Sequence, residues 1–71
     1  MPSYRPVTAT LRGLEVLSAT SRLGSRASLA EIHRLTELDK STILRMLETL
    51  EHAGFVVRDD DRRSWQVTGK T

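Results

Sequence analysis

Apolar residues recur at helical spacing in three stretches of the chain. The three sets are, in chain order, Val7, Leu11, Leu14 and Leu17; Leu29, Ile32 and Leu35; and Ile43, Leu47 and Leu50. Steps of three and four residues place each set on one face of a helix. We therefore predict helices over about 7–23, 28–36 and 39–53, the first of which should fray and end within the Ser-, Thr- and Gly-rich stretch 18–25. We expect the apolar faces of all three to be used in the core.

Residues at the ends of these helices support the same boundaries. Ser28, three residues before Glu31, fits a capping box, in which the Ser hydroxyl accepts from the backbone N–H of Glu31 and Glu31 reaches back. Asp39 is a good N-cap for the third helix, because its charge suits the positive end of the helix dipole. Gly54 lies where a left-handed C-terminal cap is wanted.

The pattern changes from helical to alternating after Gly54. "FVVR" (55–58) and "SWQV" (64–67) are typical of strands, and Trp65 and Val67 share one face of the second. The polar stretch "DDDRR" between them predicts a hairpin loop. We predict that Trp65 anchors this hairpin to the third helix. The fold class is therefore mainly α with a small β-hairpin: a winged helix-turn-helix with a three-helix core plus wing.

Composition limits the functions that such a domain can have. The 71 residues make one domain, carry a net charge of +2 and contain no Cys, which excludes disulfides and thiolate metal sites. Residues 31–51 hold three cations and five anions, a net of −2, so a DNA surface would need selected cations. No apolar run approaches the ~18 residues of a membrane span and no signal-peptide core begins the chain, so we expect a cytoplasmic protein.

Catalytic and metal-binding patterns are missing from the sequence. His33 and His52 are 19 positions apart, with no Cys and no suitably spaced acid to join them. Consecutive Asp59, Asp60 and Asp61 lack the spaced ligands and the loop Gly of a calcium site. There is neither a nucleophile–base pair nor a Gly-rich phosphate loop. We therefore expect a protein that is not an enzyme and has no cofactor.

Three segments carry a resemblance to a known family. "RGLEVL" (12–17), "SLAEIHRLTELDKSTILRMLETLEHAGFV" (28–56) and "WQVT" (65–68) resemble the N-terminal DNA-binding domain of the IclR family of bacterial transcriptional regulators. The resemblance covers roughly residues 8–68. Its most specific part is Lys40-Ser41-Thr42 followed by Arg45, although Lys-Ser-Thr alone also occurs in MarR-type regulators.

The resemblance implies sequence-specific binding to a double-stranded DNA operator, with the helix at about Asp39–Ala53 in the major groove. It also implies a longer homo-oligomeric protein, a dimer or tetramer, whose C-terminal domain binds a small-molecule effector. Accordingly, we assign residues 1–6 to a flexible arm, 7–68 to the domain and 69–71 to the start of a linker. Because the three apolar faces are expected to be used in the core, we predict that the 71 residues alone are largely monomeric.

Two positions depart from the family pattern. The family usually has Gly in the turn where this chain has Glu37, so a left-handed backbone there would cost on the order of 1 kcal/mol. The family's wing loop usually contains Gly, whereas "DDDRR" does not and is one residue longer. Of the DNA contacts that the resemblance implies, those of the wing are therefore the least transferable from the family to this chain.

The third helix carries the residues that we expect to read DNA. The N-terminal part of a recognition helix meets base edges in the major groove. Arg45 can form a forked contact with guanine, while Ser41 and Thr42 can reach bases or phosphates and Lys40 suits a phosphate. In the alternative reading, Arg45 pairs with Glu48 or Thr49, and the hydroxyls only cap the helix.

The remaining candidates each have a structural alternative. Leu44 can pack on a thymine methyl group or against the second helix. Ser28 can meet a phosphate at a helix N-terminus, cap the helix, or do both. Arg12 is a candidate for phosphate or for simple solvation. Arg62 and Arg63 lie at the wing tip and are candidates for contact with the minor groove or a phosphate. The alternative is a solvated turn, because the three Asp side chains repel phosphate and partly neutralise the two Arg. A protein-interaction module that does not read DNA is the alternative function, and the acidic middle segment keeps it open.

Overall fold

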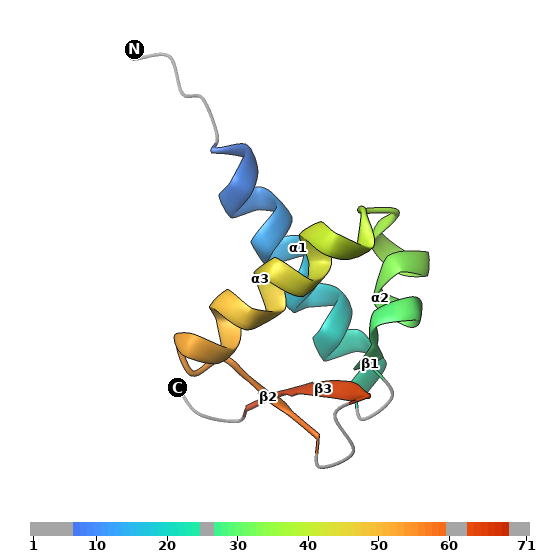
Figure 1. The fold of residues 1–71 in the computed structure, drawn as a ribbon, viewed down its shortest axis with the longest axis vertical. Helices are drawn as coiled ribbons and strands as arrows, with labels where there is room; N and C mark the ends of the chain where they lie inside the picture. The colour runs from blue at the N-terminus through green and yellow to red at the C-terminus, as the bar shows by residue number, and fades with distance from the viewer. Residues whose placement is uncertain (1–6, 25–26, 60–62, 69–71) are drawn as a thin grey trace.

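The computed structural model describes residues 7–24, 27–59 and 63–68. Its elements, in chain order, are α1 (Thr8–Leu23), β1 (Ala27–Ser28), α2 (Leu29–Thr36), α3 (Lys40–His52), β2 (Val56–Arg58) and β3 (Ser64–Val67). The three helices lie together at one end of the described part of the chain and the small antiparallel sheet lies at the other (Figure 1). The predicted winged helix-turn-helix is confirmed.

A single core joins all six elements. It consists of Val16 and Ala19 of α1, Ala27 of β1, Ile32 of α2, Ile43 and Leu47 of α3, Val56 of β2 and Trp65 of β3. Each of these side chains is at most 4% exposed. Since every element contributes at least one of them, burial of this cluster holds α3, α2 and the β-hairpin in one fixed arrangement.

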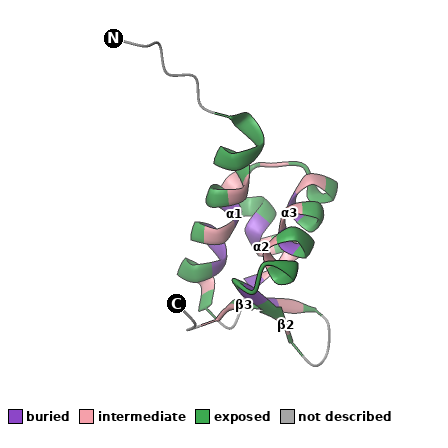
Figure 2. Cartoon of the chain, turned by 90° about the vertical axis from the view of Figure 1, so that its left-hand side faces the viewer, coloured by how far each residue is buried: buried purple, intermediate pink, exposed green. Residues whose placement is uncertain are grey.

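The prediction of which face of α1 is buried is wrong. Val7, Leu11 and Leu14 are 64%, 46% and 55% exposed, and only Leu17 of that set packs against the core. Figure 2 shows the first turns of α1 exposed and clear of the other helices. The expectation that all three apolar faces are used in the core is therefore also wrong.

The face of α1 that is buried is made of small and β-branched residues. Val16, Ala19 and Thr20 are buried, and the Thr20 hydroxyl donates a hydrogen bond of 2.7 Å to the carbonyl of Val16. Because that bond satisfies the hydroxyl, its burial leaves no unpaired polar group. Small side chains let neighbouring helices approach closely, and α1 packs against both α2 and α3.

The helix-turn-helix turn has the strained backbone that the sequence suggested. Glu37 follows α2 at φ 59° and ψ 16°, in the left-handed region, and its N–H bonds to the carbonyl of His33 at 2.8 Å. Across the same turn, the carbonyl of Leu38 accepts from Nδ1 of His33 at 2.6 Å. The backbone of this turn is thus held by two contacts to one residue, although Glu37 occupies a position that suits Gly.

The end of α3 confirms the predicted role of Gly54. Gly54 has φ 89°, its N–H bonds to the carbonyl of Glu51, and the N–H of Phe55 bonds to the carbonyl of Leu50. These two bonds are those of a Schellman motif, which requires a left-handed residue after the helix. The chain therefore leaves α3 at a defined angle and enters β2 directly.

The sheet has three strands rather than the predicted two. Its order is β1-β3-β2, with Ala27 opposite Trp65 and Arg58 also opposite Trp65. Two residues are too few for an alternating pattern, so β1 could not be predicted. Trp65 is structural, as predicted, but β3 packs mainly against α1, and it is β2 that packs against α3.

Candidate nucleic-acid interface

The core contacts of α3 determine which of its residues face outward. Ile43 and Leu47 are completely buried, and Leu50 packs against the same cluster. On the opposite side of the helix Ser41, Arg45, Glu48 and His52 are exposed, as predicted. Arg45 is therefore presented to a partner of the domain, one turn inside the N-terminal end of the helix.

The N-terminal end of α3 differs in detail from the prediction. Asp39 is the N-cap residue, but its side chain makes no capping hydrogen bond. It accepts a short hydrogen bond from the Ser41 hydroxyl instead. That bond, helped by the nearby backbone amides of Ser41 and Thr42, holds the pKa of Asp39 below its ordinary value of 3.8. A charged carboxylate therefore lies beside Ser41 at neutral pH, and Lys40 next to it is exposed.

A cleft between α1 and α3 brings three predicted residues together. Arg12, Thr42 and Arg45 line it with Thr8, Ala9 and Met46, and its volume is about 380 Å³. Its lining contains two guanidinium groups and no carboxylate. Among the described residues, neither Arg12 nor Arg45 forms an ion pair, so the proposed pairing of Arg45 with Glu48 is not seen. The cleft therefore carries uncompensated positive charge, which favours an anionic group such as a phosphate.

Thr49 contacts Arg45 through the backbone only. Its hydroxyl donates to the Arg45 carbonyl at 2.8 Å, one turn back along the helix. A hydroxyl that bonds to the helix's own backbone leaves the guanidinium unoccupied. Thr49 therefore does not prevent the side chain of Arg45 from binding another molecule.

Ser28 has the capping role predicted for it. Its hydroxyl oxygen accepts from the N–H of Glu31 at 3.2 Å at the start of α2. The reciprocal half of the capping box is absent, because the Glu31 carboxylate pairs with Arg34. Ser28 itself is half-buried.

Leu44 of α3 is 37% exposed. It therefore presents part of its apolar surface beside the exposed face of α3.

The wing contains a residue that sequence reasoning missed. The guanidinium carbon of Arg58, at the end of β2, lies 4.2 Å from the centre of the Trp65 ring. Its Nε is buried and has no hydrogen-bond partner. The only sequence signal was a cation at the end of a predicted strand, and the strand register needed to place it opposite Trp65 could not be read from the sequence. Of the two predicted wing residues, Arg63 is exposed just before β3, whereas Arg62 lies outside the described residues.

Within residues 7–24, 27–59 and 63–68, no three His, Asp or Glu side chains gather in a way that could hold a metal ion. The helices found there include none that is long and apolar enough to cross a membrane. His33, a residue that can act as a ligand, uses Nδ1 in the turn after α2.

Residues 9–60 match the model of the IclR helix-turn-helix domain. The matched region includes α1 from its second residue, α2, α3, the turn at Glu37, β2 and the cleft residues Arg12, Thr42 and Arg45. The chain therefore belongs to the IclR helix-turn-helix family, a family of DNA-binding transcription regulators that are not enzymes.

Proposed function

We propose that this domain reads a specific operator by placing α3 in the major groove, with Arg45 on a guanine and Ser41 and Thr42 on neighbouring bases or phosphates. The observation that carries the proposal is the cleft shared by α1 and α3. There Arg12, Thr42 and Arg45 line one positive concave surface without a carboxylate. A phosphate seated on it would position the duplex against the N-terminal half of α3.

The other contacts surround this centre. Lys40 takes a phosphate at the start of α3, and Ser28 takes one at the start of α2, where its oxygen already accepts from a backbone N–H. Leu44 packs on a thymine methyl group. Arg62 and Arg63 approach DNA from the wing, and Arg58, held against Trp65, adds a cation at the loop end of β2.

In its biological setting, the domain works as part of a longer cytoplasmic regulator. Family membership supports a homo-oligomer whose C-terminal domain binds a small-molecule effector. Two domains then occupy the halves of a two-fold operator, and half-sites about one helical turn, ~34–36 Å, apart are the simplest expectation.

Binding measured as a function of salt tests the proposal. Fluorescence anisotropy with a duplex selected from a random library should give a steep linear fall of log K with log salt, and tighter binding than to a scrambled duplex of equal length. Weak binding that shows neither salt dependence nor duplex preference would contradict it. Such a result would favour the second candidate function, a protein-interaction module that does not read DNA. The exposed acidic residues Glu37, Glu48 and Glu51 support this candidate.

A further inference from the structure

A hydroxyl and a carboxylate are joined at the start of α3. The Ser41 hydroxyl donates a hydrogen bond to the carboxylate of Asp39, and both side chains are exposed. A serine hydroxyl has one donor, and an ionised carboxylate has none. Because the one donor is already used, Ser41 and Asp39 can offer only lone pairs to a third molecule. We call these two side chains the acceptor pair.

The carboxylate of the acceptor pair is charged and is not neutralised. The Ser41 hydroxyl, together with the backbone amides of Ser41 and Thr42, lowers the pKa of Asp39 below 3.8, so the group is ionised at neutral pH. Within the described ranges Asp39 forms no ion pair, although Lys40 is next to it in the sequence. The acceptor pair therefore attracts hydrogen-bond donors and repels anions.

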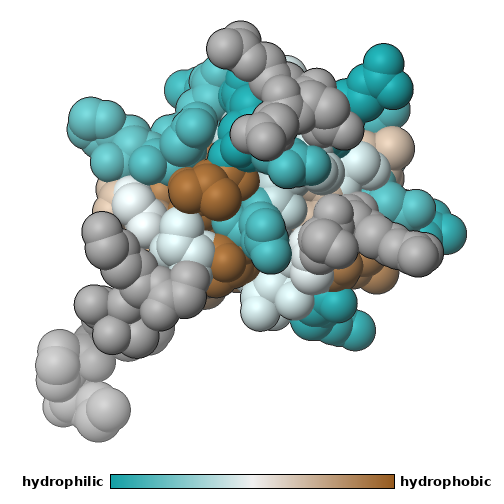
Figure 3. Space-filling view, turned by 90° about the horizontal axis from the view of Figure 1, so that it is seen from below, coloured by the Kyte–Doolittle hydropathy of each residue, from teal (hydrophilic) through white to brown (hydrophobic). Residues whose placement is uncertain are grey.

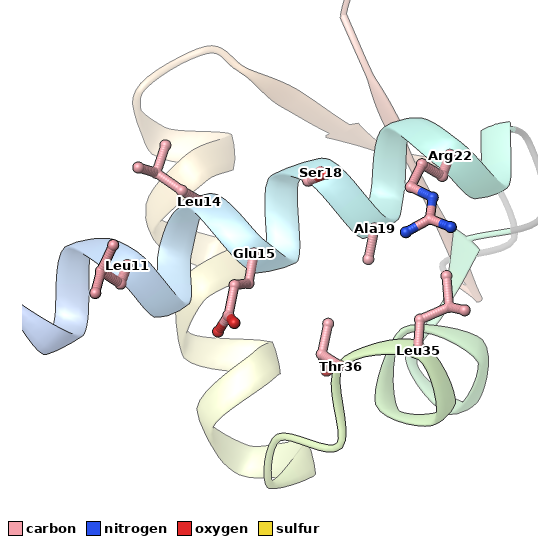
Figure 4. Close-up of a pocket in the computed structure, with 8 residues that line it drawn as sticks. All are labelled: Leu11, Leu14, Glu15, Ser18, Ala19, Arg22, Leu35 and Thr36. Atoms are coloured by element: carbon pink, nitrogen blue, oxygen red, sulfur yellow. The ribbon is translucent and has the colours of Figure 1, made fainter.

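The turn before α3 holds the acceptor pair in place. Figure 4 shows Thr36 at the end of α2, where the chain turns toward α3. The Thr36 hydroxyl donates to the carbonyl of Ile32 at 2.8 Å and accepts from the N–H of Leu38 at 3.2 Å. The Leu38 carbonyl in turn accepts from Nδ1 of His33 at 2.6 Å. Both backbone polar groups of the residue before Asp39 are thus bonded to side chains of α2, so the acceptor pair is already positioned in the free protein.

DNA presents few partners to groups that can only accept. Phosphate oxygens are themselves acceptors, so the acceptor pair cannot form a hydrogen bond with the backbone of the duplex. In the major groove, the base pairs donate only from the N6 amine of adenine and the N4 amine of cytosine. The adenine amine lies between two acceptors, its own N7 and the O4 of thymine, whereas the cytosine amine has an acceptor, guanine O6, on one side only. The acceptor pair therefore meets less repulsion at cytosine.

We infer that the acceptor pair reads the N4 amine of one cytosine in the major groove, so that Asp39 and Ser41 determine specificity at that base pair. The inference rests on the proposed function and narrows it, because Ser41 then contacts a base and not a phosphate. Any other base leaves an ionised acceptor without a partner, which costs binding free energy on the wrong sequence. Asp39 therefore acts chiefly by rejecting wrong bases.

A panel of single-base variants of the selected duplex tests the inference. For the wild-type protein, fluorescence anisotropy should show one position where replacing cytosine lowers the affinity about 5- to 150-fold, as expected for one good base contact. Asp39→Asn should lose this preference and favour adenine there, because an Asn amide can donate to N7 and accept from N6. Partial unfolding cannot produce such a change of preference. Ser41→Ala should weaken the preference for cytosine without lowering the affinity for the scrambled duplex.

Asp59→Asn is the matched control. Asp59, directly after β2, also accepts from a serine hydroxyl, that of Ser64 at 3.3 Å. It belongs to the sheet end of the molecule, away from the start of α3 (Figure 1). Figure 3 views that end and shows hydrophilic side chains around small hydrophobic areas. Asp59→Asn should keep the preference for cytosine, and circular dichroism melts verify that each variant is folded.

A modified base at the same position tests the amine directly. In N4-methylcytosine, the remaining N4 hydrogen pairs with guanine and the methyl group occupies the groove side of the amine. The wild-type protein should lose affinity for this duplex as it does when cytosine is replaced. Asp39→Ala should bind the methylated and unmethylated duplexes equally well, because the contact that the methyl group blocks is already gone.

The outcomes separate this inference from the proposed function. A wild-type protein that prefers particular duplexes but has no position requiring the cytosine amine would overturn the inference alone. So would an unchanged preference for cytosine in Asp39→Asn, or a loss in Ser41→Ala that is equal on every duplex, since the latter would place Ser41 on a phosphate. Binding without preference for any duplex would overturn the proposed function and this inference together.

Discussion

Arg58 and Trp65 face each other across β2 and β3, and the guanidinium carbon lies 4.2 Å from the ring centre. A cation over an indole face is stabilising by about 0.5–2 kcal/mol. The buried Nε of the same guanidinium has no hydrogen-bond partner, and an unsatisfied buried donor costs about 1–3 kcal/mol. The two effects have opposite signs and similar ranges, so we expect a small net contribution to stability from a residue that holds a positive charge in the wing.

This balance predicts that Arg58→Met separates stability from DNA binding. Met keeps a side chain over Trp65 and removes the unpartnered Nε, so the free energy of unfolding should change by less than about 1 kcal/mol. Loss of the charge should make the slope of log K against log salt shallower by about 0.9, as for one lost phosphate contact. Arg58→Lys, which keeps the charge, is the control for binding. An unchanged slope in Arg58→Met would mean that Arg58 does not contact the backbone of DNA.

Arg45→Ala should weaken operator binding by about 1–3 kcal/mol and relax the preference at one base pair, because a forked contact to guanine is lost. Its exposed position on α3, without an ion pair among the described residues, motivates the prediction. Anisotropy on a panel of single-base operator variants measures both effects. Glu48→Ala, on the same exposed face, is the control and should leave the base preference unchanged. If Arg45→Ala kept wild-type affinity and preference while folded, Arg45 would not be a base-reading residue.

Lys40→Ala should behave differently from Arg45→Ala. Lys40 is exposed at the first position of α3, where a phosphate contact carries no sequence information. We expect a similar loss of affinity on every duplex and a salt slope shallower by about 0.9. Titrations at several salt concentrations, with the selected and the scrambled duplex, measure this. A loss confined to the selected duplex would instead place Lys40 among the base-reading residues.

Glu37→Gly should stabilise the domain. Glu37 is held at φ 59°, which suits Gly far better than a residue with a Cβ, so relief of strain should add up to about 1 kcal/mol to the free energy of unfolding. Chemical denaturation monitored through Trp65 measures the difference. Glu37→Ala is the control, since it removes the carboxylate but keeps the Cβ and should show no such gain. A Gly variant less stable than wild type would mean that greater freedom of the unfolded chain outweighs the strain.

The lowered pKa of Asp39 predicts an acid-dependent loss of stability. A carboxyl group whose pKa is lower in the folded than in the unfolded protein stabilises the fold above its unfolded value. That contribution should be fully present above the ordinary value of 3.8 and should be lost as the pH falls through the lower folded value. Denaturation of wild type and Asp39→Asn along a pH series should therefore show a difference that shrinks below this point. Ser41→Ala should reduce the same difference at neutral pH, because the Ser41 hydroxyl is the main cause of the shift. A difference that is the same at every pH would show that Asp39 does not act through its charge.

Local signals in the sequence determined the helix-turn-helix and most of the exposed face of α3. Ser28 before Glu31, Gly54 after α3 and the spacing of Ile43 and Leu47 act over a few residues, so their meaning depends little on distant parts of the chain. The left-handed turn at Glu37 could be suspected from the resemblance to the IclR family, and the backbone has that conformation. Ser41, Thr42 and Arg45 were placed by the same short-range logic.

Tertiary structure alone decided four further features. The sequence of α1 did not determine which of its faces would be buried. The face of small and β-branched residues is buried, because it lets α1 pack against α2 and α3 at once. The two residues of β1 form a strand only because they pair with β3. Strand register places Arg58 opposite Trp65, and the packing of α1 on α3 brings Arg12 and Arg45 to the same cleft. Such contacts join residues far apart in the sequence, and short-range patterns carry no information about them.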